Sequence, residues 1–144
     1  MKYFKKNFKL ANNCILIDEH TNGLVFLEKA KGVLSHPNHV IKNSKKKSPP
    51  TLLPYPYNQA EEYYISPNGQ KLFMVHRLDL ATSGIMVAST NKTMAVKLKH
   101  LFKKNLISKT YNAIISKGEK LKLGSWVDPL VEIKSGGGIK VIRG

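Results

Sequence analysis

Short apolar runs, each bounded by polar residues or glycine, recur along this chain of 144 residues. Four of these runs predict buried strands, because they are compact and too short for helices. They lie at residues 14–17, 24–27, 72–75 and 85–88. Asn22-Gly23 lies between the first two runs and predicts a hairpin turn, since both residues tolerate a positive φ. The last two runs enclose a polar loop and predict a second, central hairpin.

Residues 92–104 carry the pattern of an amphipathic helix. Apolar residues recur on one face at helical spacing, at Met94, Leu98, Leu101 and Phe102. Lysines occupy the remaining faces and predict a basic outer surface. Thr90 or Asn91 can cap the first turn, and Asn105 can end the helix because asparagine tolerates the left-handed conformation.

The pattern after this helix predicts further strands. Residues 107–116 are predicted to form one strand, with Lys109 and Tyr111 on the same face because side chains alternate along a strand. Residues 131–133 and 139–144 predict two more strands around a glycine-rich turn at 135–138.

The charge of the chain changes the picture. Lys and Arg number 24 against 9 Asp and Glu, for a formal net charge of +15, which predicts a polyanionic partner, nucleic acid first. A membrane surface is the weaker alternative, because no basic amphipathic helix has a strong apolar face and no apolar run could span a bilayer. The single cysteine, Cys14, excludes an internal disulfide and a cysteine zinc site. Without a signal peptide, the cytoplasm is the default compartment.

Two stretches depart from the strand and helix patterns. Residues 1–12 are basic and polar and predict an N-terminal arm or an edge strand. Residues 41–70 combine a lysine run with prolines and tyrosines, and prolines at that density cannot sit inside a sheet. A long surface loop is therefore predicted at 41–70, either as an RNA contact through phosphates and stacking or as a solvated insertion.

The polar loop within the central hairpin is the candidate site. Conspicuous polar residues in a loop held by rigid elements are typical of a site, and this loop holds His76, Arg77 and Asp79. Arg77 is one of only two arginines, and its planar fork suits a phosphate or a base. The alternative, at equal weight from the spacing, is an ion pair between Arg77 and Asp79 that holds the turn.

His76-Arg77-Leu78-Asp79, followed after two variable residues by Thr82-Ser83-Gly84, resembles the signature of the RluA-type pseudouridine synthases. Weaker likenesses flank it at Lys29-x-x-Gly32, where the family's proline is absent, and at Lys109-x-Tyr111-x-Ala113. The resemblance implies an α+β fold with a mixed, mainly antiparallel sheet and flanking helices. It places a catalytic domain at 13–144, behind the arm of residues 1–12.

The resemblance also implies a chemistry, the isomerisation of uridine to pseudouridine in ribosomal or transfer RNA. No cofactor or metal is expected, and the partner is RNA, bound by a cytoplasmic monomer. An ionised Asp79 in a water-poor pocket would act as nucleophile or as base at C2′. Substrate-binding roles fall to His76, Arg77, Lys109 and Tyr111, with Tyr111 against the uracil ring. His36 and His39 lack further metal ligands and are expected in a loop.

The family's Gly-Arg-x-His-Gln element and a further basic residue have no counterpart here, so the sequence is expected to be the front part of the catalytic domain. Three interpretations follow: an active synthase or a piece of one, an RNA-binding module without catalysis, or a basic structural protein with a chance motif. The order of the motifs argues against the third. Residues 131–143 are expected either to lack their neighbours or to fold back and close the sheet.

Overall fold

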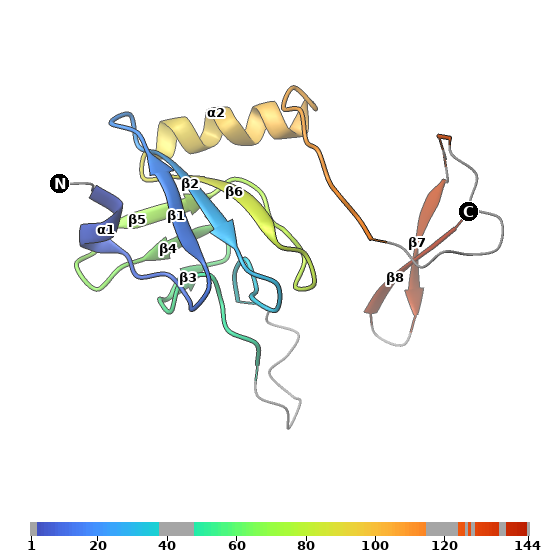
Figure 1. Ribbon diagram of the computed structural model, residues 1–144, viewed down its shortest axis with the longest axis horizontal. Coiled ribbons are helices and arrows are strands. Elements are labelled where there is room, and N and C mark those ends of the chain that lie inside the picture. Colours follow the sequence, from blue (N-terminus) through green and yellow to red (C-terminus); the bar gives the residue numbers. More distant parts are fainter. Residues whose placement is uncertain are drawn as a thin grey trace. The chain divides into compact units, whose positions relative to one another are not determined.

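The computed structural model describes residues 3–37, 48–114, 124–125, 127, 129–135 and 138–143. They belong to two compact units, Met1–Lys109 and Thr110–Gly144, which differs from the single domain expected over 13–144 (Figure 1). The lysine run at 42–47, together with His39 and Trp126, lies outside the described residues. No helix in the described ranges is both long and apolar enough to cross a membrane.

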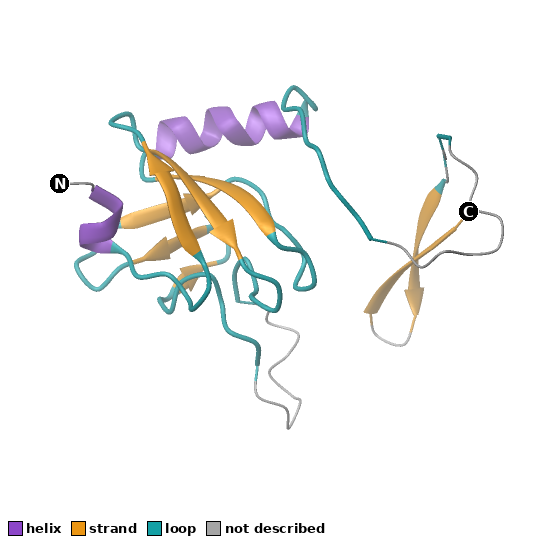
Figure 2. Cartoon of the chain, viewed as in Figure 1, coloured by secondary structure: helices purple, strands orange, loops and turns teal. Residues whose placement is uncertain are grey.

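Six strands form the sheet of the first unit in the order β1-β2-β6-β5-β4-β3, with every pair antiparallel (Figure 2). Their bounds are β1 Ile15–Glu19, β2 Leu24–Lys29, β3 Tyr57–Asn58, β4 Tyr63–Ile65, β5 Lys71–Met74 and β6 Gly84–Ser89. Both predicted hairpins are present, as β1–β2 and β5–β6. The α+β class with a mainly antiparallel sheet is confirmed.

The β1–β2 turn is built around Gly23. Its φ of +89° lies in the left-handed region that glycine adopts without a steric penalty. The Gly23 carbonyl oxygen accepts a hydrogen bond from the Thr90 N–H at 2.9 Å, which ties the turn to the end of β6. A Cβ atom on Gly23 would lie 2.9 Å from Thr90 Oγ1, so the position requires glycine for space as well as for conformation.

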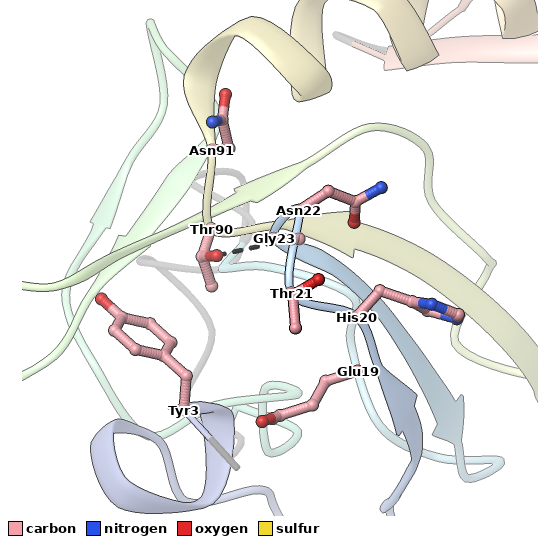
Figure 3. Close-up of a pocket in the computed structure, with 8 residues that line it drawn as sticks. All are labelled: Tyr3, Glu19, His20, Thr21, Asn22, Gly23, Thr90 and Asn91. Carbon is pink, nitrogen blue, oxygen red and sulfur yellow. Dashed lines mark hydrogen bonds between the residues drawn. The ribbon is translucent and has the colours of Figure 1, made fainter.

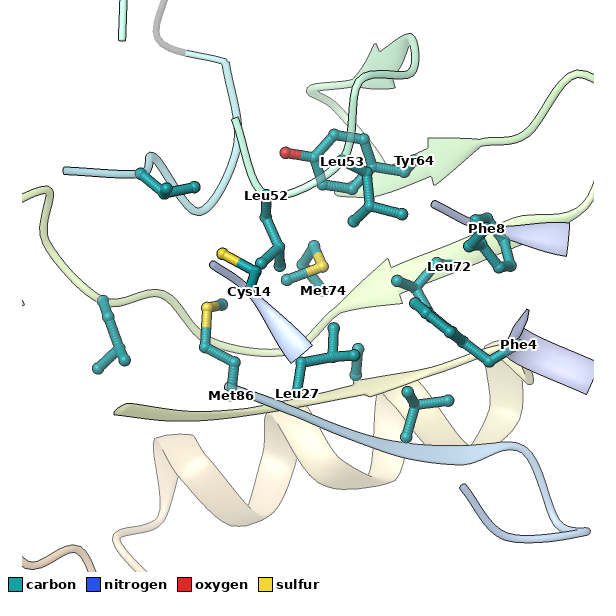
Figure 4. Packing of buried hydrophobic residues seen from close by; sticks show 14 residues of the cluster. Phe4, Phe8, Cys14, Leu27, Leu52, Leu53, Tyr64, Leu72, Met74 and Met86 are labelled. Carbon is teal, nitrogen blue, oxygen red and sulfur yellow. The ribbon is translucent and has the colours of Figure 1, made fainter. Parts of the chain in front are cut away.

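The larger core lies on one face of the sheet (Figure 4). Alternating residues of β2 and β6 point into it, because side chains alternate along a strand. Its buried members include Phe4, Phe8, Val25, Leu27, Leu52, Leu53, Tyr64, Leu72, Met74, Met86 and Ala88. Helix α1, Tyr3–Asn7, contributes Phe4, so the expected basic arm at 1–12 is wrong in its described part. Phe4 and Phe8 are spaced to share one helical face, and burying them outweighs the polarity of their neighbours.

The expected loop at 41–70 is also wrong for residues 48–70. Leu52, Leu53 and Tyr64 are fully buried, and this stretch includes β3 and β4. Pro49, Pro50, Pro54 and Pro56 precede β3, and Pro67 lies between β4 and β5, so none of them removes a hydrogen bond from a sheet interior.

Helix α2, Lys92–Lys103, covers the opposite face of β4, β5 and β6. Asn91 caps it, since its side-chain oxygen accepts from the Met94 N–H at 3.0 Å, as predicted. Asn105 follows the helix with φ of 54°. The buried helical residue is Ala95, supported by Leu98 and Phe102, whereas Leu101 is exposed and outside this core.

The second unit contains a hairpin of β7, Leu130–Ser135, and β8, Gly138–Arg143. These strands match the two predicted near the C-terminus and form a sheet of their own. The strand predicted at 107–116 is wrong for its described residues, 107–114. An extended segment becomes a strand only when a neighbouring backbone shares its hydrogen bonds, and none of the described strands pairs with residues 107–114.

Candidate active site

The loop of residues 75–83 connects β5 to β6 and carries the predicted motif. Val75 and Leu78 are buried in it, while Arg77 and Asp79 are exposed. The Thr82 N–H donates a hydrogen bond to the Asp79 carbonyl oxygen at 3.0 Å and closes a turn behind the carboxylate. Apolar residues therefore anchor the loop, and its charged residues face away from the core.

Leu78 is held from a distant part of the chain by Ser35. The Ser35 hydroxyl accepts a hydrogen bond from the Leu78 N–H at 3.0 Å and donates one to the Leu78 carbonyl oxygen at 2.7 Å. The Tyr64 hydroxyl in turn donates to the Ser35 carbonyl oxygen at 2.9 Å. All three residues are buried, so their polar groups depend on one another for hydrogen bonds.

A second anchor lies on the other side of Asp79. The Gly32 N–H donates a hydrogen bond to the Leu80 carbonyl oxygen at 2.8 Å. Gly32 has φ of +81°, the left-handed conformation that favours glycine. The backbone of Asp79 is thus fixed between two anchored neighbours, while its side chain stays accessible. This arrangement can present a carboxylate to a ligand in one orientation.

The alternative ion pair between Arg77 and Asp79 is absent from the part of the chain that the structure describes. The guanidinium fork of Arg77 is therefore available to a ligand. Asp79 is exposed, so the described residues of the first unit do not by themselves form the expected water-poor pocket around it. The residues described around the loop cover its backbone but leave the carboxylate in solvent.

The His76 side chain packs within the fold. Its Nε2 accepts a hydrogen bond from the Val87 N–H at 2.9 Å, and its ring stacks on Phe102 with centroids 4.5 Å apart. An acceptor nitrogen must be unprotonated, so this contact requires the neutral imidazole. Burial lowers the pKa of His76, and the positive charge of Lys109 acts in the same direction. The ring links the loop to β6 and α2.

Lys29 is a buried cation beside the loop. It is fully buried, and its Nζ donates to the carbonyl oxygens of Val33 at 2.7 Å and Ala30 at 3.1 Å. Burial lowers the pKa of Lys29, while the negative charge of Asp79 opposes that shift.

An aromatic pair adjoins the loop. The rings of His36 and Tyr57 stack with centroids 5.0 Å apart and an interplanar angle of 8°. Burial raises the pKa of the Tyr57 hydroxyl to about 12, Glu62 adds to this, and the charge of Arg77 opposes it. A flat pair of rings of this kind is a surface on which a base can stack.

The structure brings only some of the predicted site residues together. His76, Arg77 and Asp79 share one loop, and Lys109 is exposed at the end of the same unit. Tyr111 is exposed and belongs to the second unit. No group of three His, Cys, Asp or Glu side chains within the described residues could hold a metal ion.

Sequence reasoning missed Ser35, Tyr64, Tyr57 and the burial of Lys29. A signal existed for Lys29, because Val25, Leu27 and Lys29 alternate along β2 and therefore share the core-facing side. Ser35 carried no such signal, since it lies 43 positions from Leu78.

Comparison with known proteins agrees with the motif. The family described as RNA pseudouridylate synthase matches residues 23–138. An uncharacterized RNA pseudouridine synthase of Haemophilus influenzae is 33% identical over 69 residues, which are 48% of this chain and 31% of that protein. No solved structure matches the chain at the same level of significance.

Two further relatives carry a more specific name. Ribosomal large subunit pseudouridine synthase C of Rickettsia bellii and that of Rickettsia conorii are each 41% identical to this chain over 51 residues. These residues are 35% of this chain and 17% of each relative. The matched region therefore spans less than a third of the length of all three relatives.

Proposed function

This chain belongs to the RNA pseudouridylate synthase family, and from that premise we propose that it carries the Asp79 loop of an enzyme that isomerises uridine to pseudouridine in RNA. The observation that supports this most is the presentation of Asp79. Its carboxylate is exposed, while Ser35 and Gly32 hold the backbone on either side of it. A carboxylate that must meet one carbon atom of a sugar needs such a fixed backbone.

In the proposed reaction, the Asp79 carboxylate attacks C1′ of the target uridine or removes a proton from C2′. In either route, the bond from C1′ to N1 breaks and its electron pair leaves with the uracil ring. The ring turns over and C5 bonds to C1′; in the first route this displaces the Asp79 carboxylate from C1′, and in the second the Asp79 carboxyl group returns its proton to C2′. The proton on C5 is then lost and N1 takes up a proton. The product is an isomer of the substrate, so the net reaction consumes no second reactant.

The other predicted site residues keep their proposed roles in binding. A uridine in folded RNA must leave its stack, at a cost of a few kcal/mol. We propose that Arg77 either fills the space that the flipped uridine leaves in the stack or binds a phosphate, because its guanidinium group has no ion-pair partner among the described residues. Tyr111 would stack on the flipped ring, with His76 and Lys109 beside the substrate.

The proposed substrate is ribosomal RNA in the first instance. The Rickettsia relatives are named for the ribosomal large subunit, and they share the matched region with this chain. Transfer RNA is the second substrate to test. The proposed compartment is the cytoplasm, where both kinds of RNA are modified.

Tritium release from RNA labelled at C5 of uridine tests the proposal, because the C5 proton is lost only when the ring is reattached through carbon. We expect release with the wild-type protein and none with Asp79→Asn, which is nearly isosteric and lacks the nucleophile. Glu28→Gln is the matched control, since it removes an exposed carboxylate from β2 instead. Measurable release from the wild type that continues at the same rate in Asp79→Asn would rule out Asp79 as the essential carboxylate.

A second function, RNA binding without catalysis, is favoured by two observations. The net charge of +15 supports binding to a polyanion, and the exposure of Asp79 leaves it without the dry surroundings that the chemistry needs. RNA binding with no tritium release from the wild-type chain would support this alternative.

A further inference from the structure

A hollow of about 360 Å³ lies on the first unit between α1 and the turn at residues 66–70. Its lining includes Lys5, Lys6 and Lys9 from α1 and the residues after it, together with Asn68, Tyr55 and Phe8. We refer to this hollow as the α1 groove. It combines three cations with the side-chain amides of Asn7 and Asn68 and two aromatic rings, and none of the residues that line it is acidic.

Contacts within the fold hold the two sides of the α1 groove together. The Asn68 side-chain amide donates to the Asn7 Oδ1 at 2.7 Å, and the Lys9 N–H donates to the Tyr55 hydroxyl oxygen at 2.9 Å. Phe8 lies against Tyr55 with ring centroids 6.2 Å apart. The lysines are therefore carried on a backbone that is attached to the core, which reduces the entropy lost when a ligand orders them.

The three lysines of the α1 groove are exposed, and the described residues offer them no ion-pair partner. Helix α2 is also lysine-rich, but Glu61 neutralises Lys92 at 2.9 Å and Glu62 neutralises Lys99 at 2.5 Å. The lysines of α2 that remain unpaired therefore lie on the convex outer surface of a helix, next to lysines that are already paired with glutamates. The α1 groove instead offers unpaired charge in a concave site.

A larger hollow of about 600 Å³ beside it suits an anion less well (Figure 3). It is lined by the Glu19 carboxylate and by His20, at the tip of the β1–β2 hairpin. The Glu19 Oε2 accepts a hydrogen bond from the Phe4 N–H at 2.7 Å, so the negative charge is fixed in place. Repulsion from this carboxylate excludes a polyanion from that hollow.

We propose that the α1 groove binds the sugar–phosphate backbone of single-stranded RNA, an inference that rests on the proposed function. The lysines would contact phosphates, and the rings of Tyr55 and Phe8 give the lining an apolar part against which a base or ribose fits. The turn at 66–70 precedes β5 and the Asp79 loop follows it, so roughly 13 Å of strand separates them at about 3.3 Å per residue. The groove therefore holds a part of the RNA other than the target uridine.

Fluorescence anisotropy with a labelled single-stranded RNA tests this assignment. The first variant, Lys5→Gln/Lys6→Gln/Lys9→Gln, removes the three groove charges, and its matched control, Lys97→Gln/Lys103→Gln/Lys104→Gln, removes three exposed charges from α2 and the residue after it. With about 0.7 counterions released per phosphate contact, the groove variant should lose about ten- to hundred-fold in affinity at 0.1 M salt. Its salt slope should fall by about 2, and the α2 control should change affinity by less than about threefold.

A second pair of variants leaves α1 unaltered in case the first variant unfolds. Pro67→Glu places a carboxylate in the groove lining, and Pro54→Glu places one at another exposed proline. We expect only Pro67→Glu to weaken RNA binding. Thermal melting of each variant shows whether it is folded.

Equal loss of affinity in the groove and α2 triple variants, or no loss in the groove variants, would overturn the groove assignment and leave the proposed function standing. Failure of the wild-type chain to bind RNA would overturn both. Binding to anionic phospholipid vesicles that depends on Lys5, Lys6 and Lys9, without such dependence for RNA, would assign the groove to a membrane surface and overturn the inference.

Discussion

The Ser35 hydroxyl bonds to both backbone groups of Leu78, accepting from its N–H at 3.0 Å and donating to its carbonyl oxygen at 2.7 Å. One side chain thereby supplies hydrogen-bond partners to both the N–H and the carbonyl oxygen of a residue that lies outside the strands. Because Leu78 immediately precedes Asp79, this contact fixes the backbone position from which the Asp79 side chain projects. The site thus depends on a serine that lies outside the recognisable motif.

Ser35→Ala is expected to destabilise the protein by about 1–3 kcal/mol, because it leaves a buried N–H and a buried carbonyl group without partners. Urea denaturation measures the change in unfolding free energy. Ser83→Ala removes an exposed hydroxyl from the same loop and should stay within about 0.5 kcal/mol of wild type. Equal effects of the two substitutions would mean that the Leu78 contact contributes nothing measurable.

Stability should fall as the pH drops below 6.5, in part because of His76. Burial lowers the pKa of His76 in the folded protein below its value of 6.5 in the unfolded chain. The unfolded chain therefore binds a proton first, so the contribution is present above pH 6.5 and is lost as the pH falls toward the folded-state pKa. His76→Phe keeps a ring against Phe102, loses this titration, and should show a shallower pH dependence in urea denaturation.

The matched control for that pH series is His100→Gln, which removes an exposed imidazole from α2. A pH dependence that is as steep in His76→Phe as in wild type would show that another group controls acid stability.

Lys29→Met is expected to lower the unfolding free energy at neutral pH by about 1–3 kcal/mol. Methionine fills a similar volume, but the carbonyl oxygens of Val33 and Ala30 lose their buried donor. The exposed Lys31 lies two residues further along the chain, in the turn after β2, so Lys31→Met serves as the control and should be nearly neutral. A stabilised Lys29→Met protein would show instead that the cost of burying the ammonium exceeds the value of its two hydrogen bonds.

Gly23→Ala should destabilise the protein more than Gly69→Ala. Both glycines have positive φ, +89° and +79°, so each substitution carries a penalty of about 1–2 kcal/mol for the left-handed conformation. Only at Gly23 would the new Cβ also meet Thr90 Oγ1 at 2.9 Å, whereas nothing lies within 4 Å at Gly69. The difference in melting temperature between the two variants measures the cost of the steric contact with Thr90. Equal melting temperatures would contradict the close approach of the turn to Thr90.

The parts of the fold that follow from local pattern were predictable. The two hairpins and α2 each combine a continuous apolar period with a recognisable turn or cap, as at Asn22-Gly23 and Asn91. Helix α1 was not predictable, because it is only five residues long, two of them lysines, and its place in the fold comes from burying Phe4. The expected strand is wrong for residues 107–114 for the opposite reason, since the pattern of a single strand does not supply a partner to pair with it.

The candidate site divides in the same way. Asp79 and Arg77 were identified because polar residues between two apolar runs stand out in the sequence. The contacts that hold them connect positions far apart, such as Tyr64 to Ser35 and Ser35 to Leu78. Such contacts depend on the folded topology, which the pattern of a single sequence does not reveal.

The bulge in β1 has a consequence for the solubility of this sheet. β1 and β3 are its two edge strands, and an edge strand offers unpaired N–H and carbonyl groups to which another chain can add. The register of β1 shifts between Leu16 and Asp18, which breaks the regular spacing that an added strand would need, and β3 is only two residues long. Both edges are thereby poor templates for aggregation, even though Ile15 and Ile17 on β1 are exposed.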